Sequence, residues 1–290
     1  MVTESAPAKI NLYLHVKNRR ADEYHNLDSL VVFSDFGDSI SVEKSDQLKL
    51  SVTGLFANFL PKQSGNLVIK AAQKLQEAVG LTKGASIVLV KNLPVASGIG
   101  GGSSDAAATL RALSKLWNIT ISAKKIKKLA LTLGADVPVC LNLIPTFLSG
   151  IGAGLAPSPP LPSFWLVLVN PGIAVETREI FNNLETIGPR PERFYSAPNT
   201  LSDLINLLDV RRNDLETQAK KMFPEINAAL VNLANTPNIL LARMSGSGAT
   251  CFGIYENNTA ANYAAKLIQV ENPNWWVCKT KVTQSKSIEN

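Results

Sequence analysis

Cysteine and histidine are scarce in this 290-residue sequence, which narrows the metal chemistry available to it. The three cysteines, Cys140, Cys251 and Cys278, lie far apart, show no metal-ligand spacing and leave one thiol over in any disulfide pairing. Because only two histidines are present, a zinc site is also disfavoured. We therefore expect buried free thiols in a reducing compartment, and we assign no metal ligand in the chain.

Long apolar runs are absent as well. No stretch approaches the roughly 18 residues that a membrane-spanning helix needs. Glu4, Lys9 and Asn11 interrupt the N-terminal region, where a secretory signal would be continuously apolar. Hydrophobic residues make up 46% of the chain and charged residues 18%, so a substantial core can form. The composition predicts a cytoplasmic, enzyme-like protein of about two domains.

The net charge of +6 raises the question of nucleic-acid binding. The densest basic cluster lies in residues 124–128, beside an apolar stripe at helical spacing that includes Ile126, Leu129 and Leu133. No aromatic residues interleave these lysines to stack on bases. The pattern favours the solvated face of an amphipathic helix, with a nucleic-acid patch as the alternative. A positive field would also suit a small anionic ligand.

Hydrophobic periodicity and turn residues predict strands before helices in the first half of the chain. The expected strands are 9–16, 30–33, 39–43, 47–52 and 86–90. One expected helix spans 66–79 and is stopped by Gly80, another spans 104–117, and a third is capped by Ser122 and ends at Gly134.

Glycine and proline residues in 150–162 mark the expected domain boundary. The elements expected beyond it are a strand at 164–169, a helix from Thr177, helices between 200 and 235, a strand–loop–strand unit at 239–255, a helix at 259–269 and a last strand at 275–282. This order predicts an α+β fold with two domains, residues 1–155 and 156–290, rather than a repeating βαβ sheet.

A glycine-rich loop, LPVASGIGGGSSDAAATL at 93–110, joins an expected strand to an expected helix. Its glycines lack a Cβ, so the backbone can approach a phosphate closely while the positive end of the helix faces it. Two familiar phosphate motifs fail here, because no lysine follows the glycines and no acidic residue stands about 20 positions further on. The pattern favours an anion-binding loop. A flexible loop before a well-capped helix is the alternative.

Three motifs, in this order along the chain, are similar to those of the GHMP kinases, a superfamily of small-molecule kinases. They are Ala-Pro-Ala-Lys-Ile-Asn-Leu at 6–12, the glycine loop at 94–104, and Arg-Met-Ser-Gly-Ser-Gly-Ala at 243–249. The resemblance implies two α+β domains, an N-terminal ATP-binding domain like a ribosomal protein domain and a C-terminal ferredoxin-like domain. It also implies ATP as co-substrate and Mg²⁺ bridging the ATP phosphates.

Residues 20–30, RADEYHNLDSL, and 131–139, LTLGADVPV, are similar to one branch of this superfamily. Members of that branch phosphorylate the 2-hydroxyl of a cytidine-diphosphate-linked methylerythritol, in isoprenoid biosynthesis. Glu23 departs from the pattern, because the branch usually has glycine there. Two alternatives remain, another small-molecule kinase of the homoserine or mevalonate type and a non-catalytic RNA-binding protein of related fold. We expect no nucleic-acid or membrane partner, and a monomer or weak homodimer.

Asp136 and Lys9 are the candidate catalytic residues. Phosphoryl transfer needs positioning, charge neutralisation and a carboxylate that accepts the hydroxyl proton. Asp136 lies in an apolar setting where an unpaired carboxylate would be costly, and Lys9, in an otherwise small and apolar stretch, is its expected partner. The family resemblance assigns both positions to catalysis; the alternatives are a turn aspartate and a surface lysine. Asn11, on the same strand face as Lys9, is expected to orient the substrate.

Tyr24 and His25 are the candidates for recognising the acceptor. An aromatic ring beside a hydrogen-bonding ring suits a nucleobase, although a packed tyrosine beside a solvated histidine is the alternative. Phe181 either stacks on a base or fills the core.

The remaining candidates follow from the family resemblance. Thr177, Ser245 and Gly246 are expected near the substrate, although the last two could form a plain β-hairpin connection. Asn66 and Lys91 are expected near the adenine. The residues expected to bind the ATP phosphates are Pro94, Val95, Ala96, Ser97, Gly98, Ile99, Gly100, Gly101, Gly102, Ser103 and Ser104.

Overall fold

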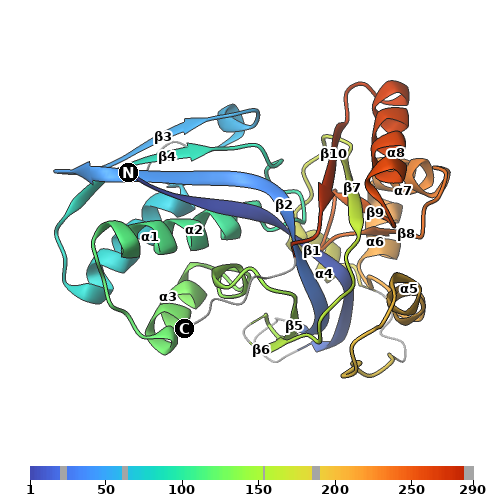
Figure 1. Ribbon diagram of the computed structural model, residues 1–290, viewed down its shortest axis with the longest axis horizontal. Coiled ribbons are helices and arrows are strands. Elements are labelled where there is room, and N and C mark those ends of the chain that lie inside the picture. The colour runs from blue at the N-terminus through green and yellow to red at the C-terminus, as the bar shows by residue number, and fades with distance from the viewer. Residues whose placement is uncertain (20–24, 61–64, 153, 185–189, 284–290) are drawn as a thin grey trace. The chain divides into compact units, whose positions relative to one another are not determined.

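The computed structural model of the chain describes residues 1–19, 25–60, 65–152, 154–184 and 190–283. The chain forms two compact units, each assembled from separate segments. Unit 1 comprises Met1–Lys9, Phe36–Val95 and Gly100–Leu143, and unit 2 comprises Ile10–Asp35, Ala96–Ile99 and Ile144–Asn290. The strands β1 (Val2–Arg19) and β2 (His25–Ser45) contribute residues to both units (Figure 1).

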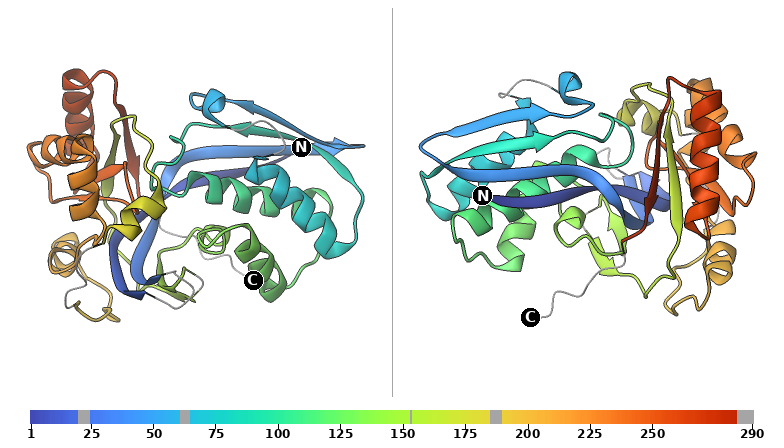
Figure 2. Two further views of the ribbon diagram at one scale, coloured as in Figure 1. Left: turned by 180° about the vertical axis from the view of Figure 1, so that it is seen from behind. Right: turned by 45° about the horizontal axis from the view of Figure 1, so that its top comes forward.

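Unit 1 is a sheet with helices packed on one face (Figure 1). In its sheet β3 (Leu48–Thr53) runs parallel to β4 (Gly84–Val90), β4 runs antiparallel to β2, and β2 pairs with β1. Its helical elements are η1 (Ala57–Phe59), α1 (Leu67–Val79), α2 (Gly101–Leu116), α3 (Ala123–Leu133) and η3 (Val139–Leu141). The helices α1 and α2 lie side by side against the sheet in both views of Figure 2.

Local sequence signals account for the ends of two of these helices. Asn66 caps α1, its Oδ1 accepting a hydrogen bond of 3.0 Å from the backbone N–H of Val68, and α1 ends at Gly80, whose φ of 67° is left-handed. Ser122 caps α3 by accepting a hydrogen bond from Lys125 N. These limits confirm the predictions for both helices.

The helix α2 begins at Gly101 rather than at Ser104, where the sequence predicted it. Gly100 takes a left-handed φ of 64° and precedes the helix as its N-cap, so the two glycines after it are helical. Glycine is a poor helix former, so helix propensity does not predict this first turn. The helix therefore starts inside the glycine loop.

The strand β2 replaces two short strands that were predicted separately at 30–33 and 39–43. Gly37 lies at the interruption, and a Cβ there would be 2.3 Å from the carbonyl oxygen of Ala6. Asp38 follows it within the strand and is buried. Because glycine and aspartate disfavour strands, the sequence pattern suggested a break where close packing against β1 requires a glycine.

Unit 2 contains a four-stranded antiparallel sheet in the order β10-β7-β9-β8, with α7 and α8 on one face (Figure 2). Its strands are β7 (Trp165–Asn170), β8 (Leu241–Met244), β9 (Cys251–Tyr255) and β10 (Trp276–Lys281). Its helices are α4 (Thr177–Asn182), α5 (Leu201–Asp209), α6 (Glu216–Met222), α7 (Pro224–Ala234) and α8 (Asn258–Glu271). The strand and helix order is that of a ferredoxin-like domain, as predicted.

The core of unit 2 lies between its sheet and these two helices. Val167 and Val169 of β7 share one face of the strand and pack with Leu233 of α7 and Ile268 of α8 in one buried cluster. Alternation along β7 thus places every second residue against the helices.

The glycine- and proline-rich stretch at 150–162 contains a strand that the sequence did not predict. The strand β6 (Gly154–Pro157) pairs antiparallel with β5 (Thr146–Gly150), and β5 pairs with the first part of β2 in unit 2. The division of the chain between residues 155 and 156 stays a prediction. Within the described ranges, no helix is both long and apolar enough to cross a membrane.

The last described residues return to β2 within unit 2. Ser34 forms a bridge with Val282, and the backbone N–H of Thr283 donates a hydrogen bond of 2.8 Å to the carbonyl oxygen of Phe33. Asp35 accepts a hydrogen bond from the backbone N–H of Lys281. The strand that starts near the N-terminus is thus completed by the C-terminal part of the chain.

Candidate active site

The glycine loop leads from β4 to α2 and leaves the first turn of that helix without a side-chain cap. Gly100 is the N-cap residue and makes no side-chain hydrogen bond to the helix. The first bond into the helix is from Ser104 N to Gly100 O, at 2.9 Å. The N–H groups of residues 101–103 therefore have no acceptor within the helix. They project from its N-terminal end, where the helix dipole is positive. This is the arrangement that binds anions at helix N-termini.

Ser104 adds a hydroxyl group to this end of the helix. Its side chain is buried, and its Oγ has no hydrogen-bond partner among the described residues. A buried hydroxyl without a partner is costly unless a ligand or water completes it. Ser104 is therefore suited to a ligand oxygen at the start of α2.

The middle of the glycine loop is held by the connection between β8 and β9 in unit 2. The hydroxyl of Ser245 donates to Gly98 O at 3.1 Å, and Thr250 N donates to Ser97 O at 3.1 Å. A Cβ on Gly98 would lie 2.4 Å from Ser245 O, and one on Gly246 would lie 2.6 Å from Gly98 O. The two backbones approach so closely that only glycine fits at these two positions.

Lys9 and Asp136 meet in unit 1. The Nζ of Lys9 donates to Oδ2 of Asp136 at 2.7 Å, and their side chains are 5% and 38% exposed. The stem of Lys9 also lies against Gly100, where a Cβ would be 3.2 Å from Lys9 Cβ. The predicted partners are thus in contact beside the end of the glycine loop, with a carboxylate that solvent and ligands can reach.

Asn11 and Ser245, both expected near the substrate, are joined in unit 2. The hydroxyl of Ser245 accepts a hydrogen bond of 3.1 Å from Asn11 N, while Asn11 Nδ2 donates to Ser29 Oγ at 2.8 Å. The Asn11 Oδ1 atom is buried and has no partner among the described residues, so it can accept a hydrogen bond from a ligand. Ser29, which orients this amide, was not found from the sequence.

Two of the candidates for the acceptor's base, His25 and Phe181, lie in unit 2. The ring of His25 stacks on that of Phe181, with centroids 5.0 Å apart and planes at 26°. The hydroxyl groups of Thr177 and Ser247 lie 2.8 Å apart and share a hydrogen bond. Tyr24 and Glu23 lie outside the described residues. Ser247, which ties the start of α4 to the β8–β9 connection, is a further residue that the sequence did not single out.

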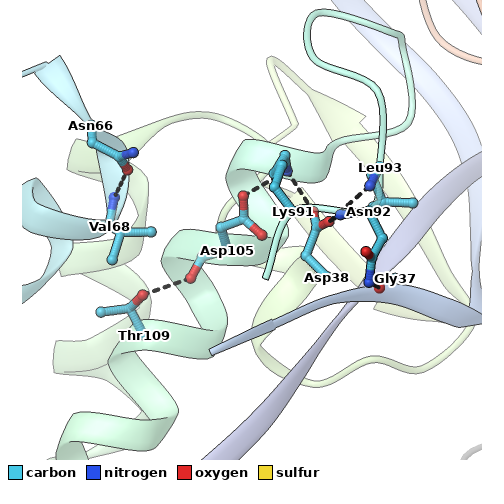
Figure 3. A network of polar contacts seen from close by, with 9 residues as sticks. All are labelled: Gly37, Asp38, Asn66, Val68, Lys91, Asn92, Leu93, Asp105 and Thr109. Atoms are coloured by element: carbon cyan, nitrogen blue, oxygen red, sulfur yellow. Dashed lines mark hydrogen bonds and ion pairs between the residues drawn. The ribbon is translucent and has the colours of Figure 1, made fainter. Parts of the chain in front are cut away.

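Lys91 is sealed in unit 1 between two carboxylates (Figure 3). Its Nζ donates to Oδ2 of Asp38 at 2.5 Å and to Oδ2 of Asp105 at 2.7 Å, and its side chain is 1% exposed. Burial lowers and the two carboxylates raise the pKa of Lys91, with a net increase. The side chain of Asn66 is also buried, as the cap of α1.

The cysteines have the chemistry of buried thiols. Burial raises the pKa of Cys140 and of Cys278 to about 12, and that of Cys251 well above its usual value. Cys278 is nevertheless only half-buried, which departs from the prediction, because β10 lies at the edge of its sheet. Among the described residues, no group of three or more histidine, cysteine or acidic side chains could hold a metal ion.

Comparison with known proteins identifies the family. The model of the GHMP kinases N terminal domain matches residues 66–142, and that of the GHMP kinases C terminal matches residues 196–270. The chain is 47% identical over 283 residues to the 4-diphosphocytidyl-2-C-methyl-D-erythritol kinase of Parvibaculum lavamentivorans, which covers 95% of this chain and 96% of that protein. The chain belongs to the GHMP kinases.

Solved structures agree with this assignment. A crystal structure of 4-(cytidine 5'-diphospho)-2C-methyl-D-erythritol kinase has a TM-score of 0.79 and 30% identity, covering 98% of this chain and 100% of that one. A homoserine kinase from Cytophaga hutchinsonii has a TM-score of 0.70 at 17% identity, covering 98% and 94%, and shows the fold alone. The predicted two-domain GHMP kinase architecture is confirmed, and GHMP kinases use ATP as co-substrate.

Proposed function

We propose that this GHMP kinase transfers the γ-phosphoryl group of ATP to the 2-hydroxyl of 4-diphosphocytidyl-2-C-methyl-D-erythritol, giving the 2-phosphate and ADP. The observation that carries the proposal is the 47% identity, over 95% of the chain, to a kinase named for that acceptor. The contact between Lys9 and Asp136 supports it, because a lysine and an accessible carboxylate are a pair suited to phosphoryl transfer.

Asp136 is the proposed general base. As the new bond forms between the acceptor oxygen and the γ-phosphorus and the bond to ADP breaks, its carboxylate takes the hydroxyl proton. Lys9 donates a hydrogen bond to that carboxylate and offsets negative charge that develops around the accepting oxygen. The partial exposure of Asp136 gives the hydroxyl access to it.

The glycine loop is the proposed site for the ATP phosphates. The free N–H groups at the start of α2 and the unpartnered hydroxyl of Ser104 are donors that phosphate oxygens would satisfy. Mg²⁺, when bound, would neutralise phosphate charge. The described residues fit an ion held mainly by the phosphates and water, because they offer that hydroxyl but no cage of acidic side chains.

The acceptor's base is assigned to His25 and Phe181, and to Tyr24, which directly precedes His25 in the sequence. Stacked rings offer a flat apolar surface, and the imidazole edge can hydrogen-bond to a cytosine. Asn11 is assigned to a substrate hydroxyl through its unpartnered Oδ1. Thr177, Ser245 and Gly246 are proposed to border the substrate, and the hydrogen bonds of the two hydroxyl residues would hold their backbone in place.

The placement of the adenine beside Asn66 and Lys91 stays a prediction. The Lys91 ammonium is engaged by Asp38 and Asp105, so a contact from this residue to a base would involve its other atoms. Asn66 retains a buried Nδ2 without a partner among the described residues, which is a donor that a base could use.

The alternative functions receive less support. Relatives at high identity are named for the cytidylyl acceptor, whereas the likeness to the homoserine kinase extends to the fold only. The absence of a nucleic-acid partner, the monomer or weak homodimer and the cytoplasmic location stay predictions.

ATP turnover against a panel of alcohols tests the proposal. We expect ADP release with 4-diphosphocytidyl-2-C-methyl-D-erythritol and none above background with homoserine or mevalonate. Turnover with either of the other alcohols at an equal or higher kcat/KM would contradict the acceptor assignment. RNA retention that weakens with salt, without ATP turnover on any alcohol, would contradict the kinase itself.

A further inference from the structure

The entry to the glycine loop is fixed by one carboxylate of β2. Asp38 Oδ1 accepts hydrogen bonds from the backbone N–H groups of Asn92, at 2.5 Å, and Leu93, at 2.8 Å. Its Oδ2 accepts the Lys91 ammonium at 2.5 Å. Lys91, Asn92 and Leu93 directly precede Pro94, the first residue of the loop. Both oxygens of Asp38 are thus occupied in holding the segment that enters the loop (Figure 3).

The exit of the loop is fixed by the same ammonium. Lys91 Nζ also donates to Asp105 Oδ2, at 2.7 Å, and Asp105 lies in α2 just after the first turn. A Cβ on Gly101 would lie 3.0 Å from that Nζ, so the ammonium packs directly against the start of the helix. Asp38, Lys91 and Asp105 are all more than nine-tenths buried. We call these three residues the loop clamp.

The loop clamp has one carboxylate more than it has cations. If all three groups were charged it would carry a net charge of −1 in a region closed to water, which is unfavourable. Asp38 has a donor on each oxygen, whereas Asp105 Oδ1 is buried and has no partner among the described residues. The free oxygen of Asp105 is therefore where a proton can reside.

The burial of Asp105 and the charges around it favour its protonated form. Burial, then the neighbouring Asp38, raise the pKa of Asp105 to about 8, although Lys91 acts in the opposite direction. From β1, Lys9 lies against Gly100, and it is already paired with Asp136. From η3, Cys140 stays protonated, because burial raises the pKa of its thiol to about 12. No other described cation is paired with Asp105.

We propose that the loop clamp positions both ends of the glycine loop for ATP, and that loss of the proton from Asp105 weakens ATP binding. The proposal rests on the proposed function, in which the loop holds the phosphates. With Asp105 protonated the clamp is neutral. With Asp105 ionised it places a negative charge beneath the N–H groups that face the phosphates, opposing the anion that they bind.

The size of the effect follows from Coulomb's law. A unit charge about 10 Å from another, at an effective dielectric constant of about 20, changes a binding constant by about tenfold. We expect ATP affinity to fall about fivefold as the pH rises from about 7 to about 9, and to approach the full factor above that pH. Linkage requires the reverse effect too, so bound ATP should raise the proton affinity of Asp105 by the same factor.

Calorimetric titration with a non-hydrolysable ATP analogue between about pH 6.5 and pH 9.5 tests this in three proteins. The wild type should lose affinity above about pH 8, and Asp105→Asn, which is neutral at every pH, should not. Glu4→Gln is the matched control, since Glu4 is an ion-paired carboxylate of unit 1, bound to Arg111 and Lys115 and not to the clamp. It should follow the wild type. The ionisation of ATP itself is common to all three.

If the affinity of Asp105→Asn for the analogue falls with pH as steeply as that of the wild type, the proposed role of the loop clamp is overturned. The proposed function is not affected by that result. A wild type that binds no ATP analogue at any pH overturns the proposed function and the clamp's role with it. Carboxyl ¹³C resonances of labelled aspartate in the wild type serve if Asp105→Asn does not fold. Asp105 should titrate near pH 8, and at a higher pH with the analogue bound. Titration of Asp105 below about pH 5 overturns the proposal.

Discussion

Unit 1 contains two lysine–aspartate contacts of equal length that differ in how far water reaches them. Lys9 meets Asp136, and Lys91 meets Asp105, with 2.7 Å between nitrogen and oxygen in each. The carboxylate of Asp136 is 38% exposed, whereas that of Asp105 is 4% exposed and shares its lysine with Asp38. The same chemical pair is thus proposed to serve a reaction where solvent reaches it and to hold a loop where solvent does not.

Access separates the two roles for a physical reason. A general base must reach the proton that it removes, which Asp136 can do and the sealed Asp105 cannot. A sealed ion pair is sensitive to the loss of one member, because the remaining charge has no water to stabilise it. Substitutions at the two lysines should therefore affect different properties of the protein.

The largest expected effect is on stability, from removal of the sealed lysine. Lys91→Met leaves Asp38 and Asp105 buried without a cation, which should lower the free energy of unfolding by about 3–5 kcal/mol. Lys9→Met should cost less, about 0–1 kcal/mol, because Asp136 remains partly solvated. Urea denaturation of both variants measures the difference. Equal losses would show that burial does not distinguish the two pairs.

The next effect is on turnover, from the accessible pair. Asp136→Asn and Lys9→Ala should each lower kcat by at least about a hundredfold, the scale of a lost base or charge stabiliser. The affinity for ATP should change little, because neither residue belongs to the loop clamp. Steady-state kinetics, with Glu4→Gln as the control, give the result. A folded variant of either residue with near wild-type kcat would remove that residue from the mechanism.

Much of the fold was predictable because its signals are local. The limits of α1 and α3 follow from a capping residue and a glycine in the right order, and both were found. The continuity of β2 was not predicted, because Gly37 and Asp38 suggested a break between two strands. What keeps the strand intact is the close approach of Ala6 and the N–H groups of Asn92 and Leu93, which lie far away in the sequence.

The same limit applies to the site. A charged residue in an apolar stretch signals a buried partner, and this reasoning, with the family resemblance, brought Lys9 and Asp136 together. The signal was equally present at Asp105, which precedes three alanines, but it does not name the partner. The ion pair between Lys91 and Asp38 spans 53 residues, and nothing local in the sequence indicates that distance.

The smallest expected effect compares two adjacent glycines of α2. A Cβ on Gly102 meets nothing within 4 Å, so Gly102→Ala should raise the free energy of unfolding by about 0.5–1 kcal/mol through helix propensity. Gly101→Ala should gain less or lose stability, because its Cβ lies 3.0 Å from Lys91 Nζ and the ammonium must shift. Thermal or urea unfolding measures the difference. Equal gains in the free energy of unfolding would mean that the Lys91 ammonium shifts at no cost.

The return of the C-terminal residues to β2 sets the order in which the newly made protein can fold. The hydroxyl of Thr283 bonds to the carbonyl of Phe33, 250 residues earlier in the chain. At about 5–20 residues per second, the ribosome needs roughly 12–50 seconds to produce that partner. Throughout this interval an edge of β2 has backbone groups without their final acceptors and donors, and such edges associate with other chains. The early strands of this kinase are therefore the part most open to pairing with other chains during synthesis.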